Sequence, residues 1–490
     1  MAQASAGSGR YSWPRLASAL MSWAGEKQPP RGDSSDGGPH SQVLHEMARR
    51  GNRIYLGAGA RGWALAAMGS GVLVLGPPRS GKTTAIVVPA ILAANGAVVS
   101  TSTKLDVLRT TAPARRRLGT CWLFDPSGQV EVPPGLTPLH WSPVEGSLRW
   151  DGALVMARAM MGAARPAGGM VDASHWAERA ETLLAPLLHA AALGGHAMEF
   201  VFRAVHRAEL DMAASILAAN RAEVAVDVLE RIAATEARER SSIFSTAAGA
   251  LAAYRSPAAL AQASSPNFDP TMFPTSVDTV YVCAPGRQQA LVAPIVVGLI
   301  EEIRAVTYAH AARRLTEGRT VDPPVLLALD EVANVAPMPD LAEIVSDGAG
   351  QGLLTLACLQ DLSQARVRWG HAADGFMSLF GTKVILPGIG DLRTLELVSA
   401  LAGEADVPVR SVSKSPWRPR SRVPRHSVTT SSRRQRRLPV DAVARADGGQ
   451  ALVIDGPRSP AWMQLTPWYA TAPWSDIVHR DGIEDGGDPR

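Results

Sequence analysis

A glycine-bounded loop between an apolar run and a helical pattern constrains the fold of this chain more than any other feature. Residues 71–75 form an apolar run short enough for a buried strand, and apolar residues at helical spacing continue through residue 89. The loop between them matches the pattern G-x-x-x-x-G-K-[ST] and reads Gly76-Pro77-Pro78-Arg79-Ser80-Gly81-Lys82-Thr83-Thr84. A strand, this loop and a helix in that order predict a site that binds the phosphates of a nucleotide.

The residue types in this loop have the chemistry that phosphate binding needs. Gly76 and Gly81 allow the backbone to curl, so that its N–H groups point at the β-phosphate near the positive end of the following helix. Lys82 would reach the β- and γ-phosphates, and the Thr83 hydroxyl would hold Mg²⁺. We therefore predict that residues 76–84 bind the nucleotide.

Further apolar runs alternate with helical patterns along the chain. Strands are predicted at residues 96–100, 121–124, 279–283, 325–329, 353–359, 382–386 and 450–454. The alternation predicts an α/β fold with a parallel sheet that is covered by helices on both faces. Ligands of such sheets bind at the carboxyl ends of the strands, where we expect the loop, Lys104 and Asp125 to cluster.

Polar residues with catalytic chemistry follow two of these predicted strands. Asp330 is expected to hold Mg²⁺ together with Thr83, and Glu331 is expected to orient and deprotonate the water that attacks the γ-phosphate. Gln360 carries an amide that would contact the γ-phosphate. The alternative interpretation is ordinary: two solvated acids that begin a loop, and a glutamine that ends a strand.

The composition divides the chain into further segments. Residues 147–264 carry Ala, Leu, Glu and Arg at helical spacing without strand-like alternation, which predicts an all-α insertion. Residues 1–40 are expected to contain a helix at 13–23, for docking on a partner or a membrane surface, and a disordered Pro/Gly/Ser-rich linker. Residues 471–490 are predicted to form an acidic, flexible tail.

Positive charge is concentrated in one run. Residues 410–437 contain nine Arg and one Lys and no acid, so we predict a basic loop there. The run is either simply solvated or contacts a phosphate backbone or an acidic partner.

Bulk composition indicates a soluble cytoplasmic chain. Apolar residues make up 46% of the chain, enough for a sizeable core, and the net charge of +4 is too small to indicate a nucleic-acid partner by itself. The three cysteines stand far apart in apolar runs, which favours buried, reduced thiols. We find neither a secretory signal nor an apolar run long enough to cross a membrane.

Two segments resemble a known family. They are Asp330-Glu331-Val332-Ala333-Asn334-Val335-Ala336-Pro337-Met338-Pro339-Asp340-Leu341 and Leu359-Gln360-Asp361-Leu362-Ser363-Gln364. Both are similar to the coupling-protein ATPases of type IV secretion and conjugation, the TraG-like family. The likeness covers roughly residues 52–469, because other motifs follow the family's order, namely the phosphate loop, Lys104, Asp106, Phe124-Asp125-Pro126 and His175-Trp176.

The resemblance implies a RecA-like P-loop motor domain at residues 41–146 and 265–470, with the all-α domain at 147–264 inserted into it. It implies a hexameric ring that hydrolyses ATP with Mg²⁺ between subunits. Such rings hand DNA, often with an attached relaxase, or protein cargo to membrane-embedded secretion components. The family's catalytic roles are carried over to Lys82, Thr83, Asp330, Glu331 and Gln360.

The chain departs from the family pattern at two points. Members normally begin with transmembrane helices, so we expect this chain to be a soluble, cytoplasmic variant, with a peripheral position at the inner face of the cell membrane as the alternative. Where members commonly carry an arginine that completes the neighbouring subunit's site, this chain has Ala349. The candidates for a replacement arginine are Arg79, Arg238, Arg240 and Arg393.

Two other functions stay open at this point. One is an FtsK-like translocase that moves double-stranded DNA without a secretion channel. The other is a nucleotide-switched adaptor with little ATP turnover.

Overall fold

The computed structural model describes residues 38–60, 62–164, 171–284, 286–319, 322–414 and 426–483. The predicted helix at 13–23 and most of the predicted linker lie outside these residues. The first described helix, α2 (Pro39–Arg49), begins slightly before the predicted start of the folded body at residue 41.

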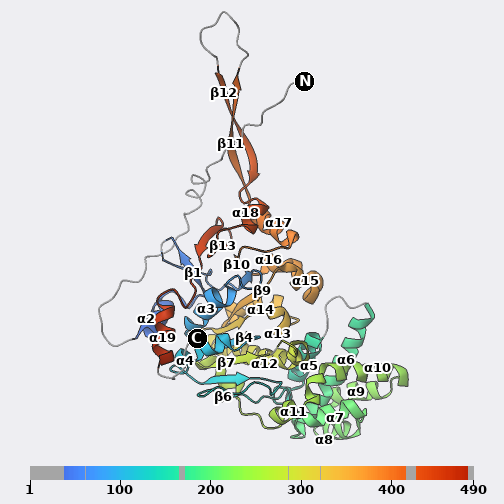
Figure 1. The fold of residues 1–490 in the computed structure, drawn as a ribbon. Coiled ribbons are helices and arrows are strands. Elements are labelled where there is room, and N and C mark those ends of the chain that lie inside the picture. The colour runs from blue at the N-terminus through green and yellow to red at the C-terminus, as the bar shows by residue number, and fades with distance from the viewer. Residues whose placement is uncertain are drawn as a thin grey trace, which may run out of the picture.

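One twelve-stranded sheet organises the molecule (Figure 1), in the order β2-β1-β14-β13-β10-β3-β9-β8-β4-β7-β5-β6. The bounds are β1 (Tyr55–Gly59), β2 (Gly62–Leu65), β3 (Val72–Leu75), β4 (Val98–Ser102), β5 (Cys121–Phe124), β6 (Thr137–Pro138), β7 (Thr279–Cys283), β8 (Val325–Leu329), β9 (Leu353–Leu359), β10 (Thr382–Ile385), β13 (Gln450–Asp455) and β14 (Ala461–Gln464).

The predicted parallel sheet is confirmed from β10 to β6, where every neighbouring pair is parallel. The sheet is larger than predicted, because β13, β14, β1 and β2 extend it by antiparallel pairing beyond β10. Of these four strands only β13 was expected. The others are short, and β1 and β2 contain glycines that weaken a strand pattern.

Helices cover both faces of the sheet, as predicted. Alternate residues of β3 enter different cores, with Leu73 and Leu75 on one face and Val72 and Val74 on the other. The second face is covered by α2, the π-helical turn η1 (Thr83–Val87), α3 (Val88–Leu92), α4 (Asp106–Arg115) and α19 (Trp474–Ile483).

The first face is covered by the long helix α12 (Gln289–Thr316) and the shorter helices that follow it. These are α13 (Val332–Val335), α14 (Leu341–Asp347), α15 (Leu362–Trp369), α16 (Phe376–Leu379), α17 (Leu392–Leu401) and α18 (Val440–Ala444). The short 3-10 turns of the chain are η2 (Glu145–Ser147), η3 (Ala252–Arg255), η4 (Pro270–Thr275), η5 (Gly348–Gln351) and η6 (Gly370–Gly375).

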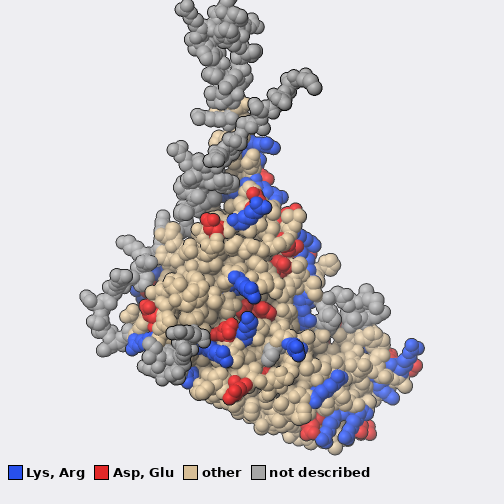
Figure 2. All heavy atoms as spheres, viewed as in Figure 1, with Lys and Arg blue, Asp and Glu red and all other residues tan. Residues whose placement is uncertain are grey.

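The chain between β6 and β7 is helical, in agreement with the predicted insertion. Its helices are α5 (Trp150–Ala164), α6 (Val171–Leu193), α7 (Met198–Arg207), α8 (Asp211–Ala219), α9 (Glu223–Ala233), α10 (Ala237–Ala250) and α11 (Pro257–Ser264). They extend from the lower right of the body (Figure 1), and both signs of charge are mixed on the face seen in Figure 2. Their apolar core is continuous with the core on the α12 face of the sheet, so the insertion and the body pack as one hydrophobic cluster.

The predicted basic loop at 410–437 is wrong for its described residues. Residues 410–414 and 426–436 belong to two long antiparallel strands, β11 (Glu404–Lys414) and β12 (His426–Arg436), which form a separate two-stranded sheet. This ribbon projects from the body next to α17 and α18 (Figure 1). The strands could not be predicted from apolar alternation, because they are rich in Arg, Ser and Thr. A ribbon that projects into solvent needs no apolar face.

The predicted flexible tail at 471–490 is also wrong for its described part. Trp474 begins helix α19 and is fully buried, with its ring 4.7 Å from that of Tyr55 and 5.9 Å from that of Trp63. Burial of aromatic rings against the edge strands holds this segment on the sheet.

The state of the three cysteines agrees with the prediction. Cys121, Cys283 and Cys358 are free and buried. Within the described ranges, the search for a helix with the length and apolarity of a membrane span finds none.

Candidate nucleotide-binding site

The predicted phosphate loop leaves the carboxyl end of β3, a strand whose four residues are fully buried. Its tight path depends on two residues with positive φ, Gly81 at 96° and Arg79 at 62°. A Cβ on Gly76 would come within 2.7 Å of the Ser80 Oγ and 2.9 Å of the Leu386 Cβ, so the loop closes tightly at its first glycine. The two motif glycines are therefore needed for shape.

Lys82 lies across its own loop. It is only 8% exposed, and its Nζ donates to the carbonyl oxygens of Gly76 at 2.5 Å and Pro77 at 2.9 Å. The ammonium group is therefore held at the opening of the loop, where a phosphate oxygen could take the place of a carbonyl.

Thr83 joins the phosphate loop to the acid pair. Its Oγ1 donates to Asp330 Oδ2 at 2.6 Å, although the two residues are 247 positions apart in the chain. Burial raises the pKa of the Asp330 carboxyl, while the hydrogen bond from Thr83 and the charge of Lys82 lower it. Thr101, at the end of β4, donates from its Oγ1 to the Asp330 carbonyl at 3.1 Å and fixes the backbone there.

Glu331 has an unusual backbone conformation. Its φ of 52° lies in the left-handed region, which residues other than glycine adopt at a cost and mostly at functional sites. The Nδ2 of Asn334 donates to Glu331 Oε2 at 3.4 Å. Asn334 was not predicted as a site residue, although it stands in the segment that carries the family resemblance.

Gln360 follows β9, the strand between β3 and β8. The Gly76 N–H donates to the Leu359 carbonyl at 3.2 Å, so the end of β9 is fastened to the start of the phosphate loop. The Gln360 N–H donates to the Gln364 Oε1 at 3.0 Å. The phosphate loop, Gln360 and the acid pair thus follow the ends of three adjacent parallel strands.

Two further residues, Asp125 and Lys104, were expected to cluster with the phosphate loop. The Asp125 carboxylate accepts hydrogen bonds from Ser127, Gln129 and Val130, so it closes its own turn after β5. Lys104 is exposed after β4.

The candidate arginines lie in several places. Arg79 is exposed in the phosphate loop itself, and Arg238 and Arg240 lie in α10 of the insertion. Arg393, on α17, lies 3.5 Å from Asp374. The source of an arginine acting between subunits stays a prediction.

The C-terminal part of the chain also borders the phosphate loop, a contact that was not predicted from the sequence. The Trp468 N–H donates to the Thr84 carbonyl at 3.0 Å, and Leu465 lies 3.8 Å from the position of a Cβ on Gly81. The segment after β14 therefore contacts both the loop and the helix that follows it.

The oxygen atoms of Thr83 and Asp330 fit a magnesium ion. Mg²⁺ prefers oxygen ligands and usually takes one or two from the protein, with phosphates and waters as the others. A cage of many protein ligands is not expected, and across the described ranges no group of three or more His, Cys, Asp or Glu is placed to hold a metal.

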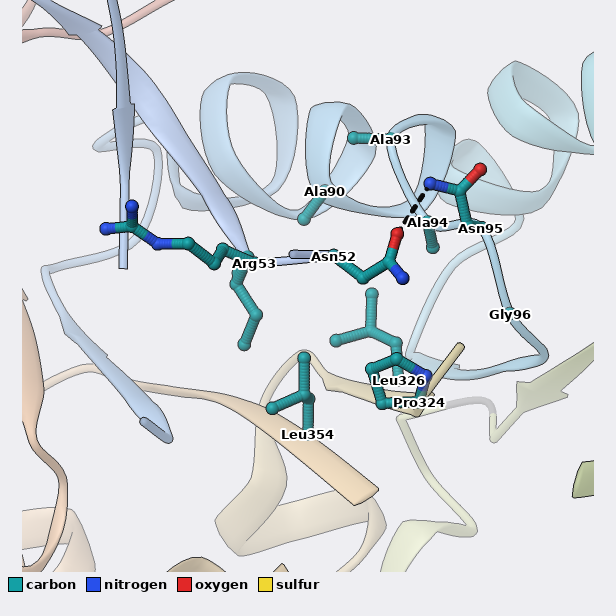
Figure 3. Close-up of a pocket in the computed structure, with 11 residues that line it drawn as sticks. Asn52, Arg53, Ala90, Ala93, Ala94, Asn95, Gly96, Pro324, Leu326 and Leu354 are labelled. Atoms are coloured by element: carbon teal, nitrogen blue, oxygen red, sulfur yellow. Dashed lines mark hydrogen bonds between the residues drawn. The ribbon is translucent and has the colours of Figure 1, made fainter. Parts of the chain in front are cut away.

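A small pocket lies at the other end of the parallel strands, away from the phosphate loop (Figure 3). Asn52, Asn95, Gly96, Pro324 and Leu354 are among the residues that line it, and Asn95 Nδ2 donates to Asn52 Oδ1 at 2.7 Å. It lies at the amino ends of β8 and β9, whereas the phosphate loop and the acids follow carboxyl ends. It is therefore separate from the candidate site.

Comparison with solved structures identifies the fold. The bacterial conjugative coupling protein TrwB, in an unbound form, is similar over 91% of this chain and 95% of its own, with a TM-score of 0.64 and 18% identity. TrwB in complex with ADP and Mg²⁺ covers 82% and 86%, with a TM-score of 0.61 and 18% identity. TrwB in complex with the ATP analogue ADPNP covers 91% and 96%, with a TM-score of 0.63 and 18% identity.

Sequence comparison identifies the family. A search of curated protein sequences finds no significant match. A family model described as type IV secretory system conjugative DNA transfer matches residues 39–478, from α2 into α19. With its RecA-like fold and the phosphate loop facing an acid pair, the chain belongs to the type IV secretory system conjugative DNA transfer family.

Proposed function

We propose that this protein is an ATP-driven coupling protein that recruits DNA, as a nucleoprotein, or protein cargo to a type IV secretion or conjugation channel. Family membership over residues 39–478 supports the process. The solved complexes of TrwB with ADP and Mg²⁺ and with ADPNP support ATP and Mg²⁺ as the ligands.

The observation that carries the proposal is the hydrogen bond of 2.6 Å between Thr83 and Asp330. It brings together a hydroxyl on the phosphate loop and the buried carboxylate that directly follows β8, beside a nearly buried lysine. Two oxygen ligands and one cation at the end of a phosphate-binding loop are the groups that a P-loop ATPase requires.

Each residue has a definite role in this proposal. Magnesium bound by Thr83 and Asp330 would neutralise charge on the β- and γ-phosphate oxygens. Lys82 would exchange its loop carbonyls for phosphate oxygens. Glu331, held by Asn334, would accept a proton from the attacking water, and the Gln360 amide would contact the γ-phosphate.

Glu331→Gln tests the catalytic assignment. Loss of the general base should lower the rate of ATP hydrolysis by about 10² to 10⁴-fold and leave ATP binding intact. The matched control is Glu343→Gln, because Glu343 is an exposed glutamate on the nearby helix α14. Equal hydrolysis rates for Glu331→Gln and the wild type would contradict the assignment.

The assembled state belongs to the same proposal. We propose a homohexameric ring at the inner face of the cell membrane, beside the membrane-embedded secretion components. ATP affinity and hydrolysis rate should be compared while protein concentration is varied. Turnover that rises with assembly supports a motor completed between subunits, whereas tight binding without turnover in the assembled ring favours a nucleotide-switched adaptor.

The cargo can be identified with the same variant. Glu331→Gln should accumulate in the ATP-bound state, so affinity capture from the native cell should retain cargo that the wild type releases. Capture of DNA with secretion components supports coupling. Directional movement on naked duplex DNA without such components would instead favour a chromosome-type translocase.

A further inference from the structure

The helix after the phosphate loop begins with an irregular turn that has a sequence cause. In η1 the Val88 N–H donates to the Thr83 carbonyl five residues earlier. The equivalent donor for the Thr84 carbonyl would be residue 89, which is a proline and has no N–H. The turn therefore presents a backbone acceptor that its own helix cannot satisfy.

The C-terminal segment supplies the missing donor. The Trp468 N–H donates to the Thr84 carbonyl at 3.0 Å. This bond ties the segment at 465–469 to the helix start. Thr466 strengthens the attachment, because its Oγ1 lies 3.0 Å from the buried Tyr55 hydroxyl on β1. The segment is thus fixed on two sides.

Strand order shows which end of a nucleotide this segment would meet. On one side of β3 lie β9 and β8, with Gln360 and the acid pair, which is the side of the γ-phosphate and magnesium. On the other side lie β10, β13 and β14. Two successive antiparallel pairings leave β14 pointing the same way as β10 and β3, so it ends at the edge that carries the phosphate loop. The segment after β14 therefore lies on the nucleoside side.

The side chains of this segment are suited to a nucleoside. Leu465 is buried against Gly81, and Trp468 is partly buried against the core. Tyr469 is 57% exposed, and its ring centroid lies 5.7 Å from that of Trp468 in an edge-to-face arrangement. A rigid backbone thus presents an exposed aromatic ring that is braced by its neighbour.

We propose that Tyr469, braced by Trp468, stacks on the base of the bound nucleotide and favours purine nucleoside triphosphates. This inference rests on the proposed nucleotide site and adds the residue that binds its nucleoside end. Stacking favours a large aromatic base and reads no hydrogen-bonding pattern, so ATP and GTP should benefit equally and CTP less.

Calorimetric titration of the full chain with Mg²⁺ and ATP, GTP, CTP or inorganic tripolyphosphate provides the test. Tyr469→Ala should weaken binding of ATP and GTP by about tenfold or more, weaken CTP binding less, and leave tripolyphosphate binding unchanged. Tyr469→Phe should bind all four ligands like the wild type. Met212→Ala, which removes a side chain of similar exposure on α8 of the insertion, is the control.

The outcomes separate this inference from the function on which it rests. If Tyr469→Ala binds ATP like the wild type, or loses ATP and tripolyphosphate equally, stacking is overturned and the phosphate site stands. If the wild type binds neither ATP nor tripolyphosphate, the nucleotide site itself is overturned.

Discussion

At the scale of single residues, Arg115 has the most demanding surroundings outside the candidate site. Its guanidinium is fully buried and donates to the carbonyls of Ala94, Gly96 and Val277 and to the Thr279 Oγ1. Burial lowers the pKa of this group below its ordinary value. Arg115 thus joins the chain segments that enter β4 and β7. Arginines are usually exposed, so this role could not be predicted from the sequence.

Arg115→Met should destabilise the protein. The substitution keeps most of the side-chain volume but leaves several buried acceptors without a donor, which costs about 3 kcal/mol or more. The midpoint of thermal unfolding should fall by several degrees. Arg109→Met, at an exposed position of the same helix, should leave the midpoint nearly unchanged. Similar midpoints for the two variants would refute the proposed role of Arg115.

At the scale of elements, α12 meets the start of the helical insertion through a partly buried carboxyl. Glu302 accepts a hydrogen bond from the Trp141 Nε1, and a Cβ on Gly146 would lie 3.1 Å from its carboxyl carbon. Burial raises the pKa of Glu302 from 4.5 to about 7, the Trp141 hydrogen bond lowers it, and the charges of Glu145 and Asp269 raise it.

This carboxyl should make stability depend on pH. Its folded-state pKa lies above its unfolded value, so the folded protein binds the extra proton and loses stability as pH rises from about 4.5 to about 7. Glu302→Gln keeps an acceptor for Trp141 and removes the ionisation. The unfolding midpoint of this variant should therefore exceed that of the wild type, and the difference should grow as pH rises. The corresponding difference in the free energy of unfolding should reach about 3 kcal/mol. A difference that does not change between pH 5 and pH 8 would argue against ionisation of Glu302.

At the scale of the whole molecule, the β11–β12 ribbon is an appendage. Among the described residues its strands pair with each other in a sheet of their own, and the Arg436 Nη1 at the end of β12 donates to the Ser399 Oγ on α17 at 3.4 Å. At its base Arg434 pairs with Glu404 at 2.6 Å. The ribbon overlaps the basic run at 410–437, which concentrates the chain's positive charge, so its contribution should be to binding rather than to the fold.

Replacement of residues 406–434 by an Asn-Gly turn tests this view. The unfolding midpoint and the affinity for ATP should match those of the wild type. The affinity for double-stranded DNA should fall, and its dependence on salt should become shallower, because fewer phosphates are neutralised. An unchanged salt dependence would exclude this run from DNA contact.

The sequence by itself determined the features that depend on residues close to one another in the chain. The phosphate loop, the buried strands around it, the acid pair and the helical insertion could all be predicted, because each depends on the spacing of neighbouring residues. For the same reason Lys82, Thr83, Asp330, Glu331 and Gln360 could be named as candidates before their positions were known.

Only the tertiary structure decided which distant segments meet. Thr83 bonds Asp330 across 247 positions, and Trp468, which follows β14, bonds Thr84, which follows β3. The Asp125 carboxylate accepts hydrogen bonds from the backbone of its own turn. Residues of the basic run pair as two strands although they have no apolar pattern. These outcomes depend on backbone pairing and on donors from far along the chain, and local spacing carries no information about either.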